Sequence, residues 1–150
     1  HHVAGPAPTT PTPATRTVLA VATAYDAKLH ADGISDAGAL IAYLDDDNAF
    51  RPHHVQALAK ALESNQDRDF AYSRMYRHGL GDEVGADPPA YGQVDSSILM
   101  QRADTHLKFG WWPAPSEYCV DWQLVNAWVT AGAAWVFVPE VTVDYYYRGS

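Results

Sequence analysis

The chain has 150 residues, of which 47% are hydrophobic, which is enough for one domain with a buried core. Eighteen acidic residues against ten basic ones give a formal net charge of −8, which argues against a nucleic-acid groove because phosphate backbones need cationic partners. No apolar run reaches the roughly 18 residues of a membrane span, and no secretory signal pattern is visible. The single Cys119 excludes an internal disulfide and suits a reducing compartment, so we expect a cytoplasmic protein with no membrane span.

The N-terminal residues differ in composition from the rest of the chain. His1 and His2 resemble the end of an affinity tag, and the residues up to 16 are rich in Ala, Pro and Thr without hydrophobic periodicity. We therefore interpret 1–16 as a tag remnant and flexible lead-in, and 17–150 as a single domain.

Two continuous β-prone runs open this domain. The runs at 17–25 and 39–44 are typical of strands that are buried on both faces of a parallel sheet. Between them, 26–38 is polar and carries two glycines, which predicts a loop.

The segment 51–64 predicts an amphipathic helix. Pro52 suits its first turn. His53 and His54 lie early in this helix, and we expect both side chains at the surface. The apolar face consists of four residues at helical spacing: Val55, Leu58, Ala59 and Leu62.

The middle of the chain predicts one strand followed by irregular segments. Hydrophobic alternation at 69–77 predicts the strand, whereas the glycines, prolines and acidic residues at 78–92 predict a mobile surface loop. We expect 94–107 to begin extended and to end in a short helix, and 108–118 to be irregular.

The C-terminal part predicts a helix and two strands. The helix begins at Cys119 and ends at Gly132, and the strands occupy 133–139 and 141–148. Because buried strands come first and mixed elements follow, the predicted class is α/β, with a mixed, mostly parallel sheet flanked by helices. The apolar face of the helix consists of Val120, Leu124, Trp128 and Val129.

Three consecutive carboxylates, Asp45, Asp46 and Asp47, follow the second predicted strand. In open parallel sheets, ligands bind outside the carboxyl ends of the strands. Mg²⁺ and Mn²⁺ prefer oxygen ligands and are often shared with substrate phosphates. Two interpretations therefore stand side by side: a divalent-metal site for a nucleoside diphosphate, or a solvated acidic turn that caps the following helix.

The surrounding sequence, IAYLDDDNAFRPHHVQAL at 41–58, resembles the metal-binding segment of family 2 glycosyltransferases with the GT-A fold. In that family an acidic motif closes a buried strand, and a stretch with Asn, an aromatic residue and Pro leads into a helix. The run VLAVATAYD at 18–26 resembles the first strand of the family and its Thr-x-Tyr turn, with Asp26 in place of the usual Asn.

Two further segments continue the resemblance. GQVDSSILMQR at 92–102 is similar to the segment that precedes the acceptor site, and YCVDWQLVNAWVTAG at 118–132 is similar to the catalytic helix start. In the second of these, Val120 replaces the first residue of the usual Glu-Asp or Gly-Asp pair. The four motifs occur in the family's order over most of 17–148.

The resemblance implies a GT-A, Rossmann-like fold and metal-dependent transfer of a sugar from a nucleoside-diphosphate sugar to an acceptor hydroxyl, with inversion. It implies that Asp47 holds Mn²⁺ or Mg²⁺, that Asp46 shares this ion or contacts the ribose, and that Asp45 lies behind them. Thr23 and Tyr25 would line the pocket of the nucleotide base, although ordinary packing at a strand end would also account for both.

On the acceptor side, Asp121 would be the general base, because inversion needs a carboxylate that takes the proton of the attacking hydroxyl. Glu117 is the alternative base. Asp95, Trp111 and Trp112 would contact the acceptor, since aromatic faces pack well against sugar rings. Simple structural roles remain open for each: Asp121 as a helix cap, Asp95 as a turn residue and one tryptophan in the core.

One departure from the family is large. About twenty residues separate Tyr25 from Asp45, too few for the two strand–helix units that the family carries there. Either residues are missing from this segment or the sugar-nucleotide half is shortened. The alternative functions are therefore a non-catalytic sugar- or nucleotide-binding remnant of the fold and a divalent-metal phosphohydrolase. The latter needs further metal ligands, and the sequence offers no His/Asp set at ligand spacing.

Overall fold

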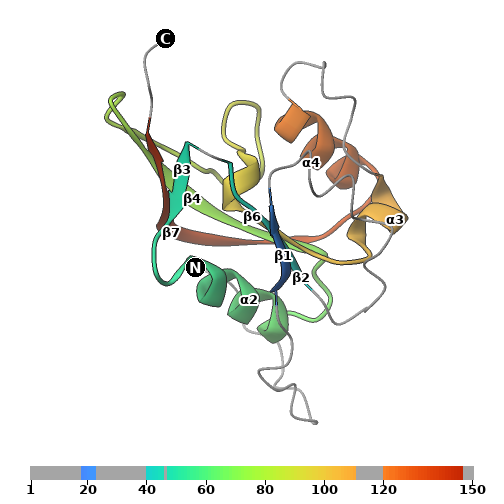
Figure 1. Cartoon of the computed structure of the whole chain (residues 1–150). Coiled ribbons are helices and arrows are strands. Elements are labelled where there is room, and N and C mark those ends of the chain that lie inside the picture. Colours follow the sequence, from blue (N-terminus) through green and yellow to red (C-terminus); the bar gives the residue numbers. More distant parts are fainter. Residues whose placement is uncertain (1–17, 23–39, 46, 111–119, 147–150) are drawn as a thin grey trace.

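The fold is described from a computed structural model (Figure 1). The structure describes residues 18–22, 40–45, 47–110 and 120–146. The predicted lead-in at 1–16 and the predicted loop at 26–38 lie outside these residues.

Seven strands form one mixed sheet in the order β1-β2-β6-β4-β7-β3, with β5 paired to β4. The pairs β1–β2 and β4–β7 are parallel, and the other four pairings among the described strands are antiparallel. The predicted α/β class is confirmed, but the prediction of a mostly parallel sheet is wrong. The strands are β1 (Val18–Ala22), β2 (Leu40–Tyr43), β3 (Asn48–Phe50), β4 (Phe70–His78), β5 (Asp82–Val84), β6 (Leu99–Arg102) and β7 (Trp135–Tyr146).

A short connection explains one of the four described antiparallel pairs, β4–β5. Only residues 79–81 join β4 to β5. Such a connection suffices for an antiparallel hairpin, whereas a parallel pair needs a crossover of about a dozen residues or more. β1 and β2 do form the expected parallel pair, and all four residues of β2 are buried.

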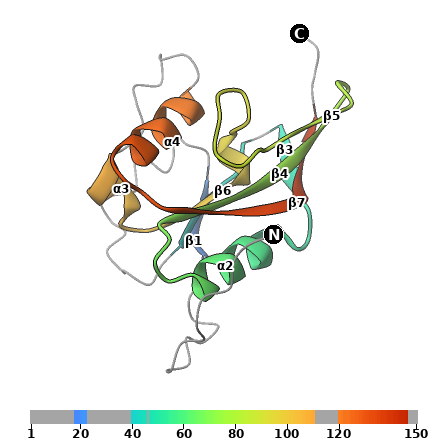
Figure 2. The ribbon, with the colours of Figure 1, turned by 180° about the vertical axis from the view of Figure 1, so that it is seen from behind.

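Helices cover both faces of the sheet (Figures 1 and 2). α2 (His54–Ser64) lies on one face, and α3 (Thr105–Phe109) and α4 (Val120–Thr130) lie on the other. A short 3₁₀ helix, η2 (Ser96–Ile98), precedes β6. No helix in the described part of the chain is long and apolar enough to cross a membrane.

The core has two parts because successive residues of β2 point to opposite faces. Leu40 and Ala42 pack in the cluster under α2, whereas Ile41 and Tyr43 pack in the cluster under α4. Trp128 of α4 is fully buried, and its indole N–H donates to the carbonyl of Gly110 at 2.8 Å. The helix predicted from Cys119 to Gly132 thus provides one of the largest side chains of the core.

The start of α2 differs from the prediction. The helix begins at His54, and Pro52 lies in the turn before it. The preceding strand β3, which the sequence did not predict, pairs with β7, and the Arg51 N–H donates to the Thr142 carbonyl at 2.8 Å. These contacts hold the chain against β7, so His54 is fully buried between helix and sheet. The prediction of a surface position is correct for His53 and wrong for His54.

β7 is one strand where the sequence predicted two, at 133–139 and 141–148. Tyr72 and Arg74 of β4 pair with Phe137 and Val141, so β7 has extra residues between two consecutive pairing positions. This irregularity contains Pro139, and bulges are among the few places in a sheet that accept a proline. Pro139 therefore bends the strand without ending it.

The segment predicted as a mobile loop, 78–92, contains β5. Hydrogen bonds hold this segment against the sheet. The Tyr72 hydroxyl donates to the carbonyl of Ala86 at 2.6 Å. The Trp135 indole N–H donates to Asp87 at 2.9 Å, and Gln93 accepts the N–H of Gly85 at 3.0 Å. We call residues 86–94 the anchored loop.

Gly85 allows this loop to approach β4, and replacing it should destabilise the protein. Its φ is +131°, and an added Cβ would lie 2.8 Å from the Ser73 carbonyl oxygen. We expect Gly85→Ala to cost roughly 2 kcal/mol of unfolding free energy, measured by urea denaturation. The matched control is Gly92→Ala in the same loop, where φ is +79° and the space around an added Cβ is open. Equal losses in the two variants would contradict the role assigned to close approach.

Candidate active site

Three carboxylates that are distant in the sequence meet at Ser96, the first residue of η2. The Ser96 hydroxyl donates to Asp45 Oδ2 at 3.1 Å. The Ser96 backbone N–H donates to Asp121 Oδ2 at 2.9 Å. Asp95 is the residue immediately before. We call Asp45, Asp95 and Asp121 the carboxylate triad.

The register of the sheet explains this meeting. β6 runs antiparallel to β2, with Met100 opposite Ala42. The residues just before β6 therefore lie beside the residues just after β2, which brings Ser96 next to Asp45. Asp121 is added from a helix that packs on the sheet, because α4 begins at Val120 and the Asp121 carboxylate in its first turn accepts the Ser96 N–H of η2.

Asp95 is held by its own turn and by Asn48. It caps η2 by accepting the Ser97 N–H at 2.8 Å. The Asn48 side-chain amide donates to Asp95 Oδ1 at 3.4 Å and to the Ser97 hydroxyl oxygen at 2.6 Å. That hydroxyl oxygen also lies 3.4 Å from the Asp45 backbone N–H. Asn48 and Ser97 thus fix the distance between the end of β2 and η2.

The triad concentrates negative charge in a poorly hydrated place. Burial, followed by the charges of Asp121 and Asp45, raises the pKa of Asp95 to about 7. Burial also raises the pKa of Asp121 to about 6, with a further contribution from Asp45, while the Ser96 N–H acts in the opposite direction. Carboxylates with such raised pKa values are common in functional sites. They can accept or release a proton near neutral pH.

Asp47 lies apart from these hydrogen bonds, in the turn between Asp45 and β3. Its backbone carbonyl accepts the Tyr146 N–H at 3.0 Å. Asp47 is partly exposed to solvent. Within the described residues, no group of three or more His, Cys, Asp or Glu side chains is arranged to hold a metal ion. The other predicted site residues lie outside the described ranges: Thr23, Tyr25, Asp46, Trp111, Trp112 and Glu117.

The structure therefore brings together Asp95 and Asp121, which the sequence analysis assigned to the acceptor side, with Asp45, which it placed behind the metal ligands. Sequence reasoning missed Ser96, Ser97 and Asn48. A signal for the serines exists in the run Asp95-Ser96-Ser97, since an Asp that precedes a short helix often caps it.

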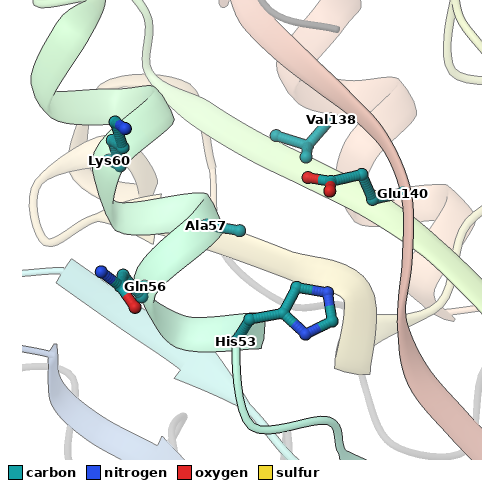
Figure 3. Close-up of a pocket in the computed structure, with 6 residues that line it drawn as sticks. All are labelled: His53, Gln56, Ala57, Lys60, Val138 and Glu140. Carbon is teal, nitrogen blue, oxygen red and sulfur yellow. The ribbon is translucent and has the colours of Figure 1, made fainter.

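A hollow lies away from the triad, between α2 and β7 (Figure 3). Its volume is about 280 Å³. Lys60 comes from the helix, His53 from the turn just before it, and Glu140 from the strand. Because α2 covers the opposite face of the sheet from α4, we do not assign this hollow to the site of the triad. Its lining is completed by Gln56, Ala57 and Val138.

Comparisons with known proteins identify no family for this chain. A scan against protein-family models found no match. A search of curated proteins found no match either.

Proposed function

We propose that the protein is a metal-dependent glycosyltransferase with a GT-A-type fold, which moves a sugar from a nucleoside-diphosphate sugar to an acceptor hydroxyl with inversion. The observation that carries the proposal is the meeting of Asp45, Asp95 and Asp121 at Ser96. Each of these carboxylates belongs to a different one of the segments that resemble the family. Their meeting is what a shared site for these motifs requires.

In this proposal Asp121 takes the proton from the acceptor hydroxyl. The raised pKa of Asp121 supports this role, because a general base works best when its pKa lies near the working pH. The Ser96 N–H holds one carboxylate oxygen in place and so orients the group. Asp95, one residue from Ser96, would hydrogen-bond the acceptor from the other side.

A divalent cation fits the chemistry of the neighbouring acidic run. Carboxylate oxygens are hard ligands suited to Mn²⁺ or Mg²⁺, and the negative charge of the triad adds to the attraction. Asp47 and Asp46 would hold the ion, and Thr23 and Tyr25 would bind the nucleotide base. When bound, the ion would offset negative charge on the leaving diphosphate.

A thermal-shift screen tests donor binding. UDP, GDP, dTDP and CDP are each added with and without Mn²⁺. A nucleotide at about 100 times its Kd stabilises the folded state by about 2.7 kcal/mol. For a chain of this size that corresponds to a rise in Tm of roughly 5–10 °C. We expect one nucleotide to give this rise only with Mn²⁺.

Two variants make the screen specific. Asp47→Asn should remove the Mn²⁺-dependent rise, whereas Asp67→Asn, in an exposed turn after α2, should keep it. The absence of a rise for every nucleotide in the wild-type protein would contradict the proposal.

Non-catalytic binding of a sugar or nucleotide is the second candidate function. The short segment between Tyr25 and Asp45 favours it, because base recognition in the family involves this region. Metal-dependent hydrolysis of a sugar nucleotide, which is transfer of the sugar to water, separates the two. Binding without hydrolysis or transfer would support the second candidate.

A further inference from the structure

Tyr91 is an exposed aromatic residue that contacts Trp122, the residue after the proposed catalytic base. It lies in the anchored loop, and 63% of its surface is exposed. Its ring meets the ring of Trp122 edge-on, with 6.5 Å between the ring centroids and 88° between the planes. Trp122 follows Asp121 directly in α4. Figures 1 and 2 both show the loop before η2 rising beside this helix.

The loop that carries Tyr91 is fixed on both sides of it. Before Tyr91, Ala86 accepts from the Tyr72 hydroxyl and Asp87 accepts from the Trp135 indole. After Tyr91, Gln93 accepts the N–H of Gly85. Ordering a loop when a ligand binds costs conformational entropy. Here folding has already ordered the backbone, so less entropy is lost on binding.

The combination of an aromatic ring and nearby carboxylates suits a neutral sugar. One face of a pyranose ring presents C–H groups that pack on an aromatic ring, and its hydroxyls donate to carboxylates. Asp121 and Asp95 are the carboxylates available for this. An anionic diphosphate would instead be repelled by the triad unless a cation lay between them. The diphosphate of the donor is therefore expected beside the cation of the acidic run, and the acceptor sugar beside Tyr91.

We propose that Tyr91, supported by Trp122, forms an aromatic platform that binds a pyranose ring of the acceptor next to Asp121. The acceptor is accordingly a carbohydrate, and Tyr91 is a specificity-determining residue. This inference rests on the proposed glycosyltransferase function.

The test compares Tyr91→Ala, Tyr91→Phe and a control, Leu80→Ala, which removes another exposed side chain from the turn between β4 and β5. Each protein is given the sugar nucleotide that the wild type hydrolyses, first without an acceptor and then with a panel of methyl pyranosides and disaccharides. Loss of one aromatic contact of up to about 1.5 kcal/mol corresponds to about tenfold. We expect Tyr91→Ala to raise the acceptor KM by about tenfold, and its rate of hydrolysis without acceptor is measured as the reference for donor turnover. Tyr91→Phe and Leu80→Ala should behave like the wild type.

An NMR titration gives a readout other than activity. The indole N–H signal of Trp122, assigned with a Trp122→Phe variant, should shift when the accepted pyranoside is added to the wild type. In Tyr91→Ala the midpoint of this shift should need about tenfold more pyranoside. An unchanged acceptor KM in Tyr91→Ala would overturn the platform and leave the proposed function intact. Hydrolysis without transfer to any sugar of the panel would overturn the carbohydrate acceptor. The absence of both hydrolysis of any sugar nucleotide and transfer to any acceptor of the panel would overturn the proposed function and the acceptor role with it.

Discussion

Replacing Asp121 by Asn should reduce sugar transfer by about 10²–10⁴-fold, which is the usual contribution of a general base. Nucleotide binding should stay nearly unchanged, because the proposed donor contacts come from the acidic run and the first strand. Initial rates of sugar transfer and the nucleotide-dependent rise in Tm, measured on the same variant, check the two halves of this prediction.

Asp121→Asn tests the catalytic role better than Asp121→Ala does, because Asp121 also accepts a hydrogen bond that stabilises the fold. The Ser96 N–H that it accepts belongs to a buried residue. Asn retains an oxygen that can accept this N–H, whereas Asp121→Ala leaves it unpaired at a cost of about 1–3 kcal/mol. We therefore expect Asp121→Ala to lose both transfer and stability, and Asp121→Asn to lose mainly transfer. Wild-type turnover in Asp121→Asn would rule out Asp121 as the base.

Acid should destabilise the protein through His54. This imidazole is fully buried, and its Nδ1 lies 2.7 Å from the Thr142 hydroxyl oxygen, which lies 2.6 Å from that of Ser73. The Phe50 ring stacks on it with 4.0 Å between centroids. Its other nitrogen, Nε2, is buried without a hydrogen-bond partner among the described residues. A proton on this ring would place a cation in an apolar setting.

Burial, assisted by the neighbouring charge of His53, lowers the pKa of His54 from 6.5 to about 4. Because the folded-state pKa is the lower one, the unfolded chain binds the extra proton first as pH falls. The stability associated with neutral His54 is therefore complete above pH 6.5 and is lost progressively between pH 6.5 and 4. This pKa difference corresponds to roughly 3 kcal/mol.

Urea denaturation at pH 7.5 and at pH 4.5 measures this effect. We expect His54→Gln to be less stable than the wild type at pH 7.5 but to lose less stability on acidification. His53→Gln removes the adjacent, exposed imidazole and should follow the wild type closely. Parallel acid profiles for the wild type and His54→Gln would contradict the assignment.

Periodicity was enough to predict most elements of the described fold. The continuous apolar run at 39–44 predicts a strand buried on both faces, and all four residues of β2 are buried. The spacing of Leu58 and Leu62 correctly predicts the buried side of α2. These patterns succeed because a strand or helix must hide its apolar side chains whatever its neighbours are.

Local patterns failed where a contact distant in sequence decides the outcome. Pro139 predicts a break, but a bulge against β4 keeps β7 continuous. His54 looks like a surface residue of a helix, but the pairing of β3 with β7 turns it towards Thr142. β3 itself is only three residues long, so it shows no periodicity of its own.

The same distinction between local patterns and distant contacts applies to the candidate site. The sequence by itself determined the types of group present: an acidic run after a buried strand, an Asp at the start of a segment predicted to be extended and an Asp at a helix start. Only the tertiary structure decided which of them meet. The antiparallel register of β2 and β6 brings Asp45 to Ser96, and α4 adds Asp121 from the far end of the chain. Each residue type by itself defines the chemistry of its side chain. Which side chains lie close together depends on strand register and helix packing, and these are set by contacts between residues far apart in the sequence.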